Sequence, residues 1–144
     1  MSQWTHVCGC IRVDTIPLHV LGLRDYDFEN LLKKQFGETW SYDDENEEDK
    51  YDKCSVPKGS EGSIQYKIQK TGSENNMTWG LITIWGDLRD FDDPQEIFEW
   101  IKKSCDSKDE LFSIRSCCVE VYVESNMRYL IFADQEEQII MKKI

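Results

Sequence analysis

Histidine and cysteine alternate near the N-terminus of this 144-residue chain, in the pattern His6-x-Cys8-x-Cys10. Alternate residues of an extended strand project from one face and lie about 6.5–7 Å apart. This spacing is too wide for the usual zinc site, whose ligands follow the Cys-x2–4-Cys spacing of a turn. A metal site would also need Cys118 beside this group on an adjacent strand. We therefore expect structural residues here and no metal.

A nucleophilic cysteine would need His6 or His19 beside it, together with a third group that orients the histidine. The chain has only these two histidines, and neither lies in a familiar nucleophile turn. No pair stands out among its 28 acidic residues as a general acid and base. We predict no catalytic residues and no cofactor, and an enzyme is the less favoured alternative.

A dense acidic run lies between residues 43 and 52. It lacks the central glycine and the twelfth-position glutamate of a calcium-binding EF-hand loop. Such a run is usually a solvated surface, and the alternative is contact with a basic partner. The candidate partner-binding residues are Asp43, Asp44, Glu45, Glu47, Glu48 and Asp49.

Two glycine-containing segments, Pro57–Ser63 and Gly86–Asp90, lie at the ends of predicted strands. Glycine amides, a lysine, serine hydroxyls and one arginine are groups that can hold an anion or a nucleotide. The first segment lacks the helix and the Gly-Lys-Ser/Thr ending of a P-loop. Pairing of the arginine with a neighbouring carboxylate is the alternative to ligand binding. The candidate ligand-binding residues are Lys58, Gly59, Ser60, Gly62 and Arg89, and they require the two segments to meet at one end of a sheet.

Hydrophobic spacing predicts the elements that position these residues. Residues 4–14 alternate as a strand with Val7, Ile11 and Val13 on its apolar face. Residues 26–36 have helical spacing and stop at Gly37, and Asp93-Pro94-Gln95-Glu96 is a helix start. Further strands are predicted at 63–70, 79–85, 116–124, 129–133 and 138–141, with a turn at 71–76.

This order of elements predicts one α+β domain over residues 1–144, with an acidic mobile loop at about 38–58. Strand, helix, strand, strand, helix, strand is the ferredoxin-like split βαβ pattern, here followed by an added C-terminal hairpin. Both helices should cover one face of an antiparallel sheet. The other face would carry His6, Cys8, Cys10 and Arg12.

Charge and composition narrow the classes of function. The chain has 17 basic and 28 acidic residues and a net charge of −11, which disfavours direct nucleic-acid binding. No apolar run is long enough for a membrane span, and the N-terminus lacks the pattern of a secretory signal. We expect a soluble cytoplasmic protein whose six cysteines remain free thiols.

Three segments carry a resemblance to a known group of proteins: Trp4-Thr5-His6-Val7, Pro57–Ser63 and Gly86–Asp90. They resemble a family of small, acidic, uncharacterised proteins of T4-like tailed phages. The resemblance implies an early or accessory protein in the cytoplasm of an infected bacterial host, and it brings no assigned activity or catalytic residue. We predict a non-enzymatic interaction protein that inhibits a host or anti-phage defence component with a basic surface. The alternative is a small-molecule or nucleotide-binding module that uses the two glycine-containing segments.

The C-terminal hairpin decides the expected assembly. If it covers the open face of the sheet, we expect a monomer. If it extends the sheet edge, His6, Cys8 and Cys10 stay uncovered and a two-fold homodimer is favoured. Tyr129 and Ile131 would then lie at the dimer interface.

Overall fold

The computed structural model describes residues 2–15, 27–41, 45–46, 48, 52–74, 77–106, 112–124 and 127–144. Within these residues the chain is an α+β protein with two helices and a six-stranded antiparallel sheet, which confirms the predicted class. The elements are, in chain order, β1 (Trp4–Thr15), α1 (Asp27–Phe36), β2 (Gln65–Glu74), β3 (Met77–Arg89), α3 (Pro94–Cys105), β4 (Phe112–Val123), β5 (Met127–Ala133) and β6 (Ile139–Lys143).

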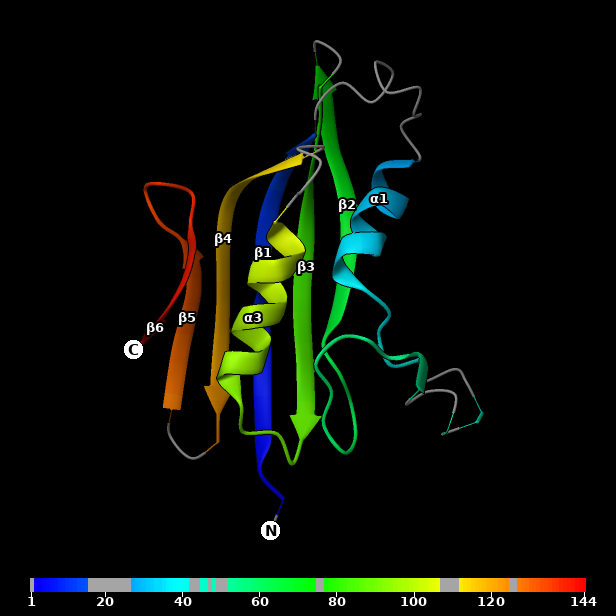
Figure 1. Cartoon of the computed structure of the whole chain (residues 1–144), viewed down its shortest axis with the longest axis vertical. Helices are drawn as coiled ribbons and strands as arrows, with labels where there is room; N and C mark the ends of the chain where they lie inside the picture. Colours follow the sequence, from blue (N-terminus) through cyan, green and yellow to red (C-terminus); the bar gives the residue numbers. More distant parts are fainter. Residues whose placement is uncertain are drawn as a thin grey trace.

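The strand order across the sheet is β2-β3-β1-β4-β5-β6 (Figure 1). The N-terminal strand β1 is central and pairs along its whole length with β3 and, from Thr5, with β4. The C-terminal hairpin of β5 and β6 continues the sheet beyond β4. The hairpin therefore extends the edge of the sheet and does not cover its face.

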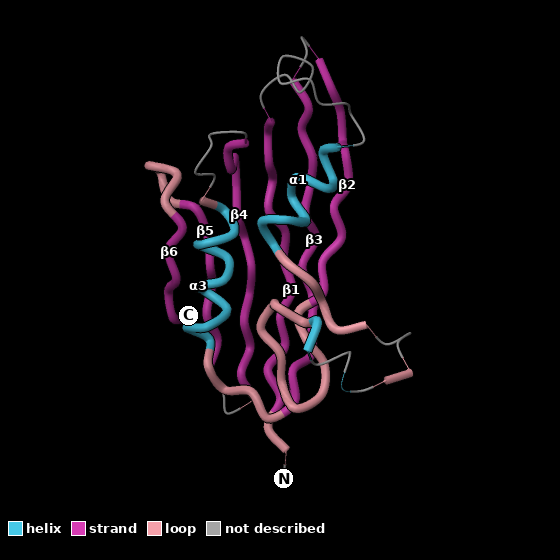
Figure 2. Tube along the Cα trace, turned by 45° about the vertical axis from the view of Figure 1, so that its right-hand side comes forward, coloured by secondary structure: helices cyan, strands magenta, loops and turns pink. Residues whose placement is uncertain are grey.

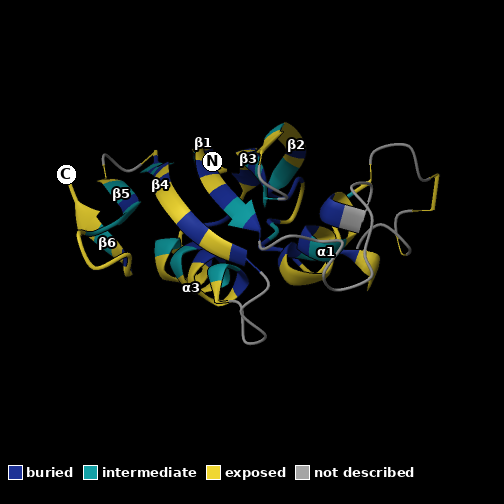
Figure 3. Ribbon diagram, turned by 90° about the horizontal axis from the view of Figure 1, so that it is seen from above, coloured by how far each residue is buried: buried dark blue, intermediate teal, exposed yellow. Residues whose placement is uncertain are grey.

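Both helices run along the strands, and the view from above shows them on one side of the sheet (Figures 2 and 3). The N-cap of α3 is Asp93, whose side chain accepts a hydrogen bond from the Glu96 amide at 3.3 Å. The stop after α1 is Gly37, whose φ of 98° is a conformation that glycine adopts without strain. Trp100 on α3 connects the two helices by a hydrogen bond, because its indole Nε1 donates to the carbonyl of Phe36 on α1 at 2.8 Å.

The hydrophobic core lies between the helices and the sheet. The predicted inward face of β1 is confirmed, since Val7, Ile11 and Val13 are buried. Alternate residues of β3 and β4 pack against these side chains. The helices complete the core with Phe28, Leu32 and Phe36 from α1 and with Ile97 and Ile101 from α3. Alternation thus leaves the other face of each central strand pointing away from the helices.

Strand lengths depart from the predictions in two places. Residues 86–89 lie beyond the predicted strand at 79–85, but they are the end of β3, because Gly86 to Arg89 pair with Val7 to Trp4 of β1. The strands β2 and β3 also extend into the expected turn at 71–76, as far as Glu74 and from Met77. Long pairing with a neighbouring strand outweighs the local preference of glycine for turns.

The C-terminal end of the 38–58 segment is packed. Cys54 and Val56 are buried, and the Glu38 carbonyl accepts a hydrogen bond from the Ser55 amide at 2.8 Å. These contacts join the residues that follow α1 to the residues that precede β2. This part of the predicted loop therefore belongs to the folded core.

Candidate functional site

The two glycine-containing segments meet at one end of the sheet, near the N-terminus (Figure 2). The Ser60 amide donates to the Arg89 carbonyl at 2.9 Å, and the Arg89 amide donates to the Glu61 carbonyl at 3.0 Å. A Cβ at Gly59 would lie 2.6 Å from the Arg89 amide nitrogen, so only glycine fits this close approach. The two segments thus lie together at one end of the sheet, as the predicted ligand site requires.

The polar groups at this end of the sheet form hydrogen bonds and an ion pair with one another. The Gly59 amide donates to the Gly62 carbonyl at 2.9 Å. The Arg89 guanidinium lies 3.4 Å from the Glu61 carboxylate and donates from Nε to the Ser2 hydroxyl at 2.9 Å. These contacts are the turn-and-ion-pair arrangement that the sequence offered as the alternative to ligand binding.

Lys58, the remaining candidate ligand-binding residue, points toward the folded chain. Its ammonium donates to the Cys54 carbonyl at 2.9 Å. Its charge also favours the ionised form of Glu96, whose pKa is nevertheless raised, chiefly by burial and then by Asp93. Ligand binding at these residues stays a prediction.

Two of the six candidate partner-binding acids fall within the described residues. Glu45 and Glu48 are exposed, as a solvated charge run requires. Asp43, Asp44, Glu47 and Asp49 lie outside the described residues. The acidic-run hypothesis stays a prediction.

The face of the sheet opposite the helices, which we call the open face, carries His6, Cys8, Cys10 and Arg12 as predicted. Trp85 and Ile140 are 44% and 37% exposed there. Register places further apolar side chains on this face, namely Trp79, Leu81, Tyr122, Leu130 and Phe132, all half-buried. The open face thus combines aromatic, aliphatic and thiol side chains with charged ones, among them Lys67, Glu120 and Lys142.

His6 lies between two carboxylates at one end of the open face. Its Nδ1 is 2.6 Å from the Asp87 carboxylate, and its Nε2 is 3.3 Å from the Glu124 carboxylate. The imidazole stacks on Tyr122 with ring centroids 6.0 Å apart and planes at 19°, and the Arg128 guanidinium lies 5.1 Å from the Tyr122 ring centre. The cluster joins β1, β3, β4 and β5.

This environment favours the imidazolium form of His6. Only a protonated ring donates from both nitrogens at once. The hydrogen bond to Asp87 raises the pKa of His6 above its usual value, partial burial opposes this, and Glu124 adds to the increase. A general base needs a free ring nitrogen, and both nitrogens of His6 have partners. The cluster is therefore an ion-pair network across the strands.

The thiols divide into an exposed and a covered set. Cys8, Cys10 and Cys118 are exposed, Cys54 and Cys117 are buried, and Cys105 is half-buried; all six are free. Burial raises the pKa of Cys117 to about 12, which keeps it a thiol at neutral pH. Within the part of the chain that is described, no group of three His, Cys, Asp or Glu side chains is placed to hold a metal ion.

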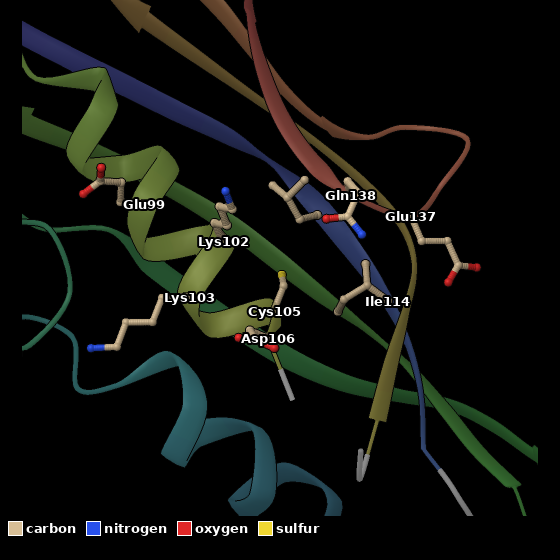
Figure 4. Close-up of a pocket in the computed structure, with 9 residues that line it drawn as sticks. Glu99, Lys102, Lys103, Cys105, Asp106, Ile114, Glu137 and Gln138 are labelled. Carbon is tan, nitrogen blue, oxygen red and sulfur yellow. The ribbon is translucent and has the colours of Figure 1, made fainter. Parts of the chain in front are cut away.

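A groove of about 690 Å³ lies between the C-terminal end of α3, β4 and the turn before β6 (Figure 4). Its charged residues are of both signs: Lys102 and Lys103 against Glu99, Asp106 and Glu137. The C-terminal end of a helix carries a partial negative charge, which the two lysines offset. Burial also raises the pKa of Cys105, which lines the groove. The described residues that line the groove thus include both charge signs and no activated nucleophile.

Comparison of the chain with protein-family models, curated proteins and solved structures gave no match. Within the described residues, no helix has the length and apolar character needed to cross a membrane.

Sequence reasoning missed the partners of His6 and the extent of the open face. Asp87 alternates with Trp85 along β3, and Glu124 follows β4 directly. Alternation could have placed Asp87 and Trp85 on one face, but only the register of β3 and β4 against β1 brings them to His6 and Cys8. Register depends on pairing between residues that are more than 60 positions apart in the sequence.

Proposed function

We propose that this chain is a non-enzymatic interaction protein that binds another protein on the open face of its sheet. The observation that carries the proposal is the set of exposed and half-buried apolar side chains on a sheet face that lies opposite both described helices. Protein interfaces are enriched in tryptophan, tyrosine, phenylalanine and arginine and have a polar rim. The open face has this composition.

Apolar residues lie on several strands of this face, and Glu120 separates Cys8 from Leu130 in one row. Trp85 lies across from Cys8, and Leu130 lies two strands further along the same row. In the next row Phe132 pairs with Ile140 on β6. Exposed apolar side chains gathered on one face mark interaction sites on proteins.

The charge of the chain and its resemblance to phage proteins support one kind of partner. A net charge of −11 favours association with a basic surface. The exposed Glu45 and Glu48 belong to an acidic run that can contribute to this attraction. The resemblance to proteins of T4-like phages supports a host or anti-phage defence protein, met in the cytoplasm of the infected bacterium.

The test compares two substitutions of similar exposure on opposite faces. Trp85→Glu places a charge on the open face, and Met127→Glu is the matched control, because Met127 is 41% exposed and pairs with Val123 on the helix-bearing face. Proteins retained from a bacterial lysate are identified by mass spectrometry, then purified and measured by calorimetry. We expect Trp85→Glu to weaken binding roughly 30-fold, the effect of losing about 2 kcal/mol at a central aromatic anchor.

The same measurement separates the open face from the acidic run. A third variant neutralises the six acids between positions 43 and 49. If Trp85→Glu and Met127→Glu bind the purified partner equally, the open face is not the docking surface. If the neutralised variant alone loses binding, the acidic run is the contact.

A second copy of the chain is the alternative occupant of this face. The hairpin extends the edge of the sheet, which is the condition under which a homodimer was expected. Ile131 is fully buried in the hydrophobic core, so a charge there would disrupt the core and could not report on an interface. Sedimentation of wild type and Trp85→Glu at micromolar concentration is the appropriate test of a dimer on the open face.

The finer fold assignment is also a proposal: we assign the first four strands and two helices to the ferredoxin-like split βαβ arrangement. The order β2-β3-β1-β4, with α1 after β1 and α3 after β3, supports it. The hairpin of β5 and β6 would then be an extension at the β4 edge. An experimental structure that includes the connection after β1 tests this assignment.

A further inference from the structure

Two exposed thiols face each other across the centre of the sheet. Cys10 on β1 and Cys118 on β4 are direct partners in the antiparallel register, and both are exposed and free. Their chain neighbours Ile11 and Val119 are buried on the helix side. Both thiols therefore project from the open face at the same level.

The backbone spacing at this pair suits a disulfide. The Glu124 amide donates to the Trp4 carbonyl at 3.1 Å, and the register from there to Arg12 is regular. Hydrogen-bonded pairs recur at every second residue, so Cys10 and Cys118 form one, with Cα atoms about 5.5 Å apart. Disulfides join Cα atoms that are about 4.4–6.8 Å apart.

A glycine beside the pair brings the two strands close together. A Cβ at Gly9 would lie 2.5 Å from the Val119 Cα and nearer still to the Cys118 carbonyl oxygen. The strands therefore approach here more closely than a side chain at position 9 would allow. The backbones of β1 and β4 are therefore held close together beside Cys10 and Cys118.

Neither Cys8 nor Cys117, the other two strand cysteines, has a cysteine as its register partner. Cys8 faces Glu120 on β4 and is only diagonal to Cys118, at a Cα distance of about 7–8 Å. Cys117 is buried on the opposite side of β4. Among the described strand pairs, Cys10 and Cys118 are the thiols that face one another directly.

We propose that Cys10 and Cys118 are a dithiol modification site that exchanges with small-molecule disulfides of the glutathione class and forms a reversible cross-strand disulfide. The Cβ–Cβ distance of a cross-strand pair is about 4.5–5.5 Å, and hydrogen-bonded pairs have the longer distances in this range. A disulfide needs a Cβ–Cβ distance of about 3.5–4.5 Å. Closing the bond strains the sheet, and strained disulfides are readily reduced. The oxidation state of the site therefore follows the ratio of oxidised to reduced small-molecule thiols around it. The proposal does not depend on the proposed protein-binding function.

The exchange proceeds in two balanced steps. One protein thiol loses its proton and attacks a sulfur of oxidised glutathione, which forms a mixed disulfide and releases one glutathione thiolate. The second protein thiol loses its proton and attacks the protein sulfur of the mixed disulfide, which releases the second glutathione thiolate. One disulfide bond breaks and one forms, and two electrons pass from the protein to glutathione.

The experiment equilibrates the folded full-length protein in buffers with varied ratios of oxidised to reduced glutathione. Free thiols are then blocked with N-ethylmaleimide under native conditions and the intact mass is measured. We expect a species about 2 Da lighter before labelling, because two hydrogen atoms leave. The number of its exposed thiols that N-ethylmaleimide labels should fall from three to one. Added dithiothreitol should restore all three.

Single substitutions assign the bond. Cys10→Ser and Cys118→Ser should each abolish the lighter species, while the controls Cys8→Ser and Cys117→Ala should retain it. Near-ultraviolet circular dichroism checks that each variant is folded. A bond that persists in Cys10→Ser or Cys118→Ser overturns the proposal. Mixed glutathione adducts without an internal bond at every ratio overturn it as well.

Discussion

Replacing Gly9 with alanine tests how closely β1 and β4 are packed. An added Cβ would lie 2.5 Å from the Val119 Cα, which is a backbone atom of the neighbouring strand. Carbon atoms pack best at about 3.5–4.0 Å, so the strands must separate by about 1 Å. Neither strand can yield locally, because β1 pairs on both sides in the centre of the sheet.

The expected loss of stability follows from that displacement. The hydrogen bonds on either side of Gly9 would lengthen from about 2.9 Å to about 3.9 Å, beyond the useful range. Two such bonds contribute about 1–3 kcal/mol together. Alanine offsets about 0.5–1 kcal/mol of this by restricting the unfolded chain, and the steric contact adds to the loss. We expect a net decrease of about 1–3 kcal/mol, within the usual range for overpacking.

Urea unfolding followed by tryptophan fluorescence measures this change, with stability obtained by linear extrapolation. For a chain of this size the midpoint temperature should fall by about 3–10 °C. Gly72→Ala is the control, because its Cβ would meet the Trp79 indole at 2.7 Å, a side chain that can rotate on the open face. Gly9→Ala with wild-type stability, or Gly72→Ala as the more destabilised variant, would refute the reasoning.

Three further predictions concern single contacts. Trp100→Phe should lower the free energy of unfolding by about 1 kcal/mol, because the hydrogen bond to the Phe36 carbonyl is lost, and unchanged urea unfolding would contradict this. Asp93→Ala removes the helix N-cap and should lower it by about 0.5–2 kcal/mol, whereas Asp93→Asn should lower it less. The His6 pKa is raised, so its contribution to stability is fully present below about 6.5 and is lost as pH rises through the folded value. NMR titration should show that Asp87→Asn lowers the pKa of His6, and an unchanged value would exclude Asp87 as the main cause.

Local patterns predicted the elements whose signals lie within a few residues. Asp93 before Pro94 and Gly37 after an apolar run mark helix ends because capping and left-handed φ are properties of single residues. Alternation along β1 likewise separated Val7 from His6, because the strand has a period of two. The sequence by itself thus determined the order of elements, the inward face of β1 and the residues of the opposite face.

Only the tertiary structure decided which of these residues meet. The end of β3 at Gly86 has the composition of a turn, yet it pairs with Val7, because the ladder of a long neighbouring strand outweighs local propensity. Lys58 and Arg89 were grouped by charge, but each has partners in its own surroundings. Cys10 and Cys118 face each other because β1 and β4 share one register, and a slip of one residue would send their side chains to opposite faces of the sheet. Contacts between segments so distant in sequence depend on the packing of the whole sheet, which no local pattern records.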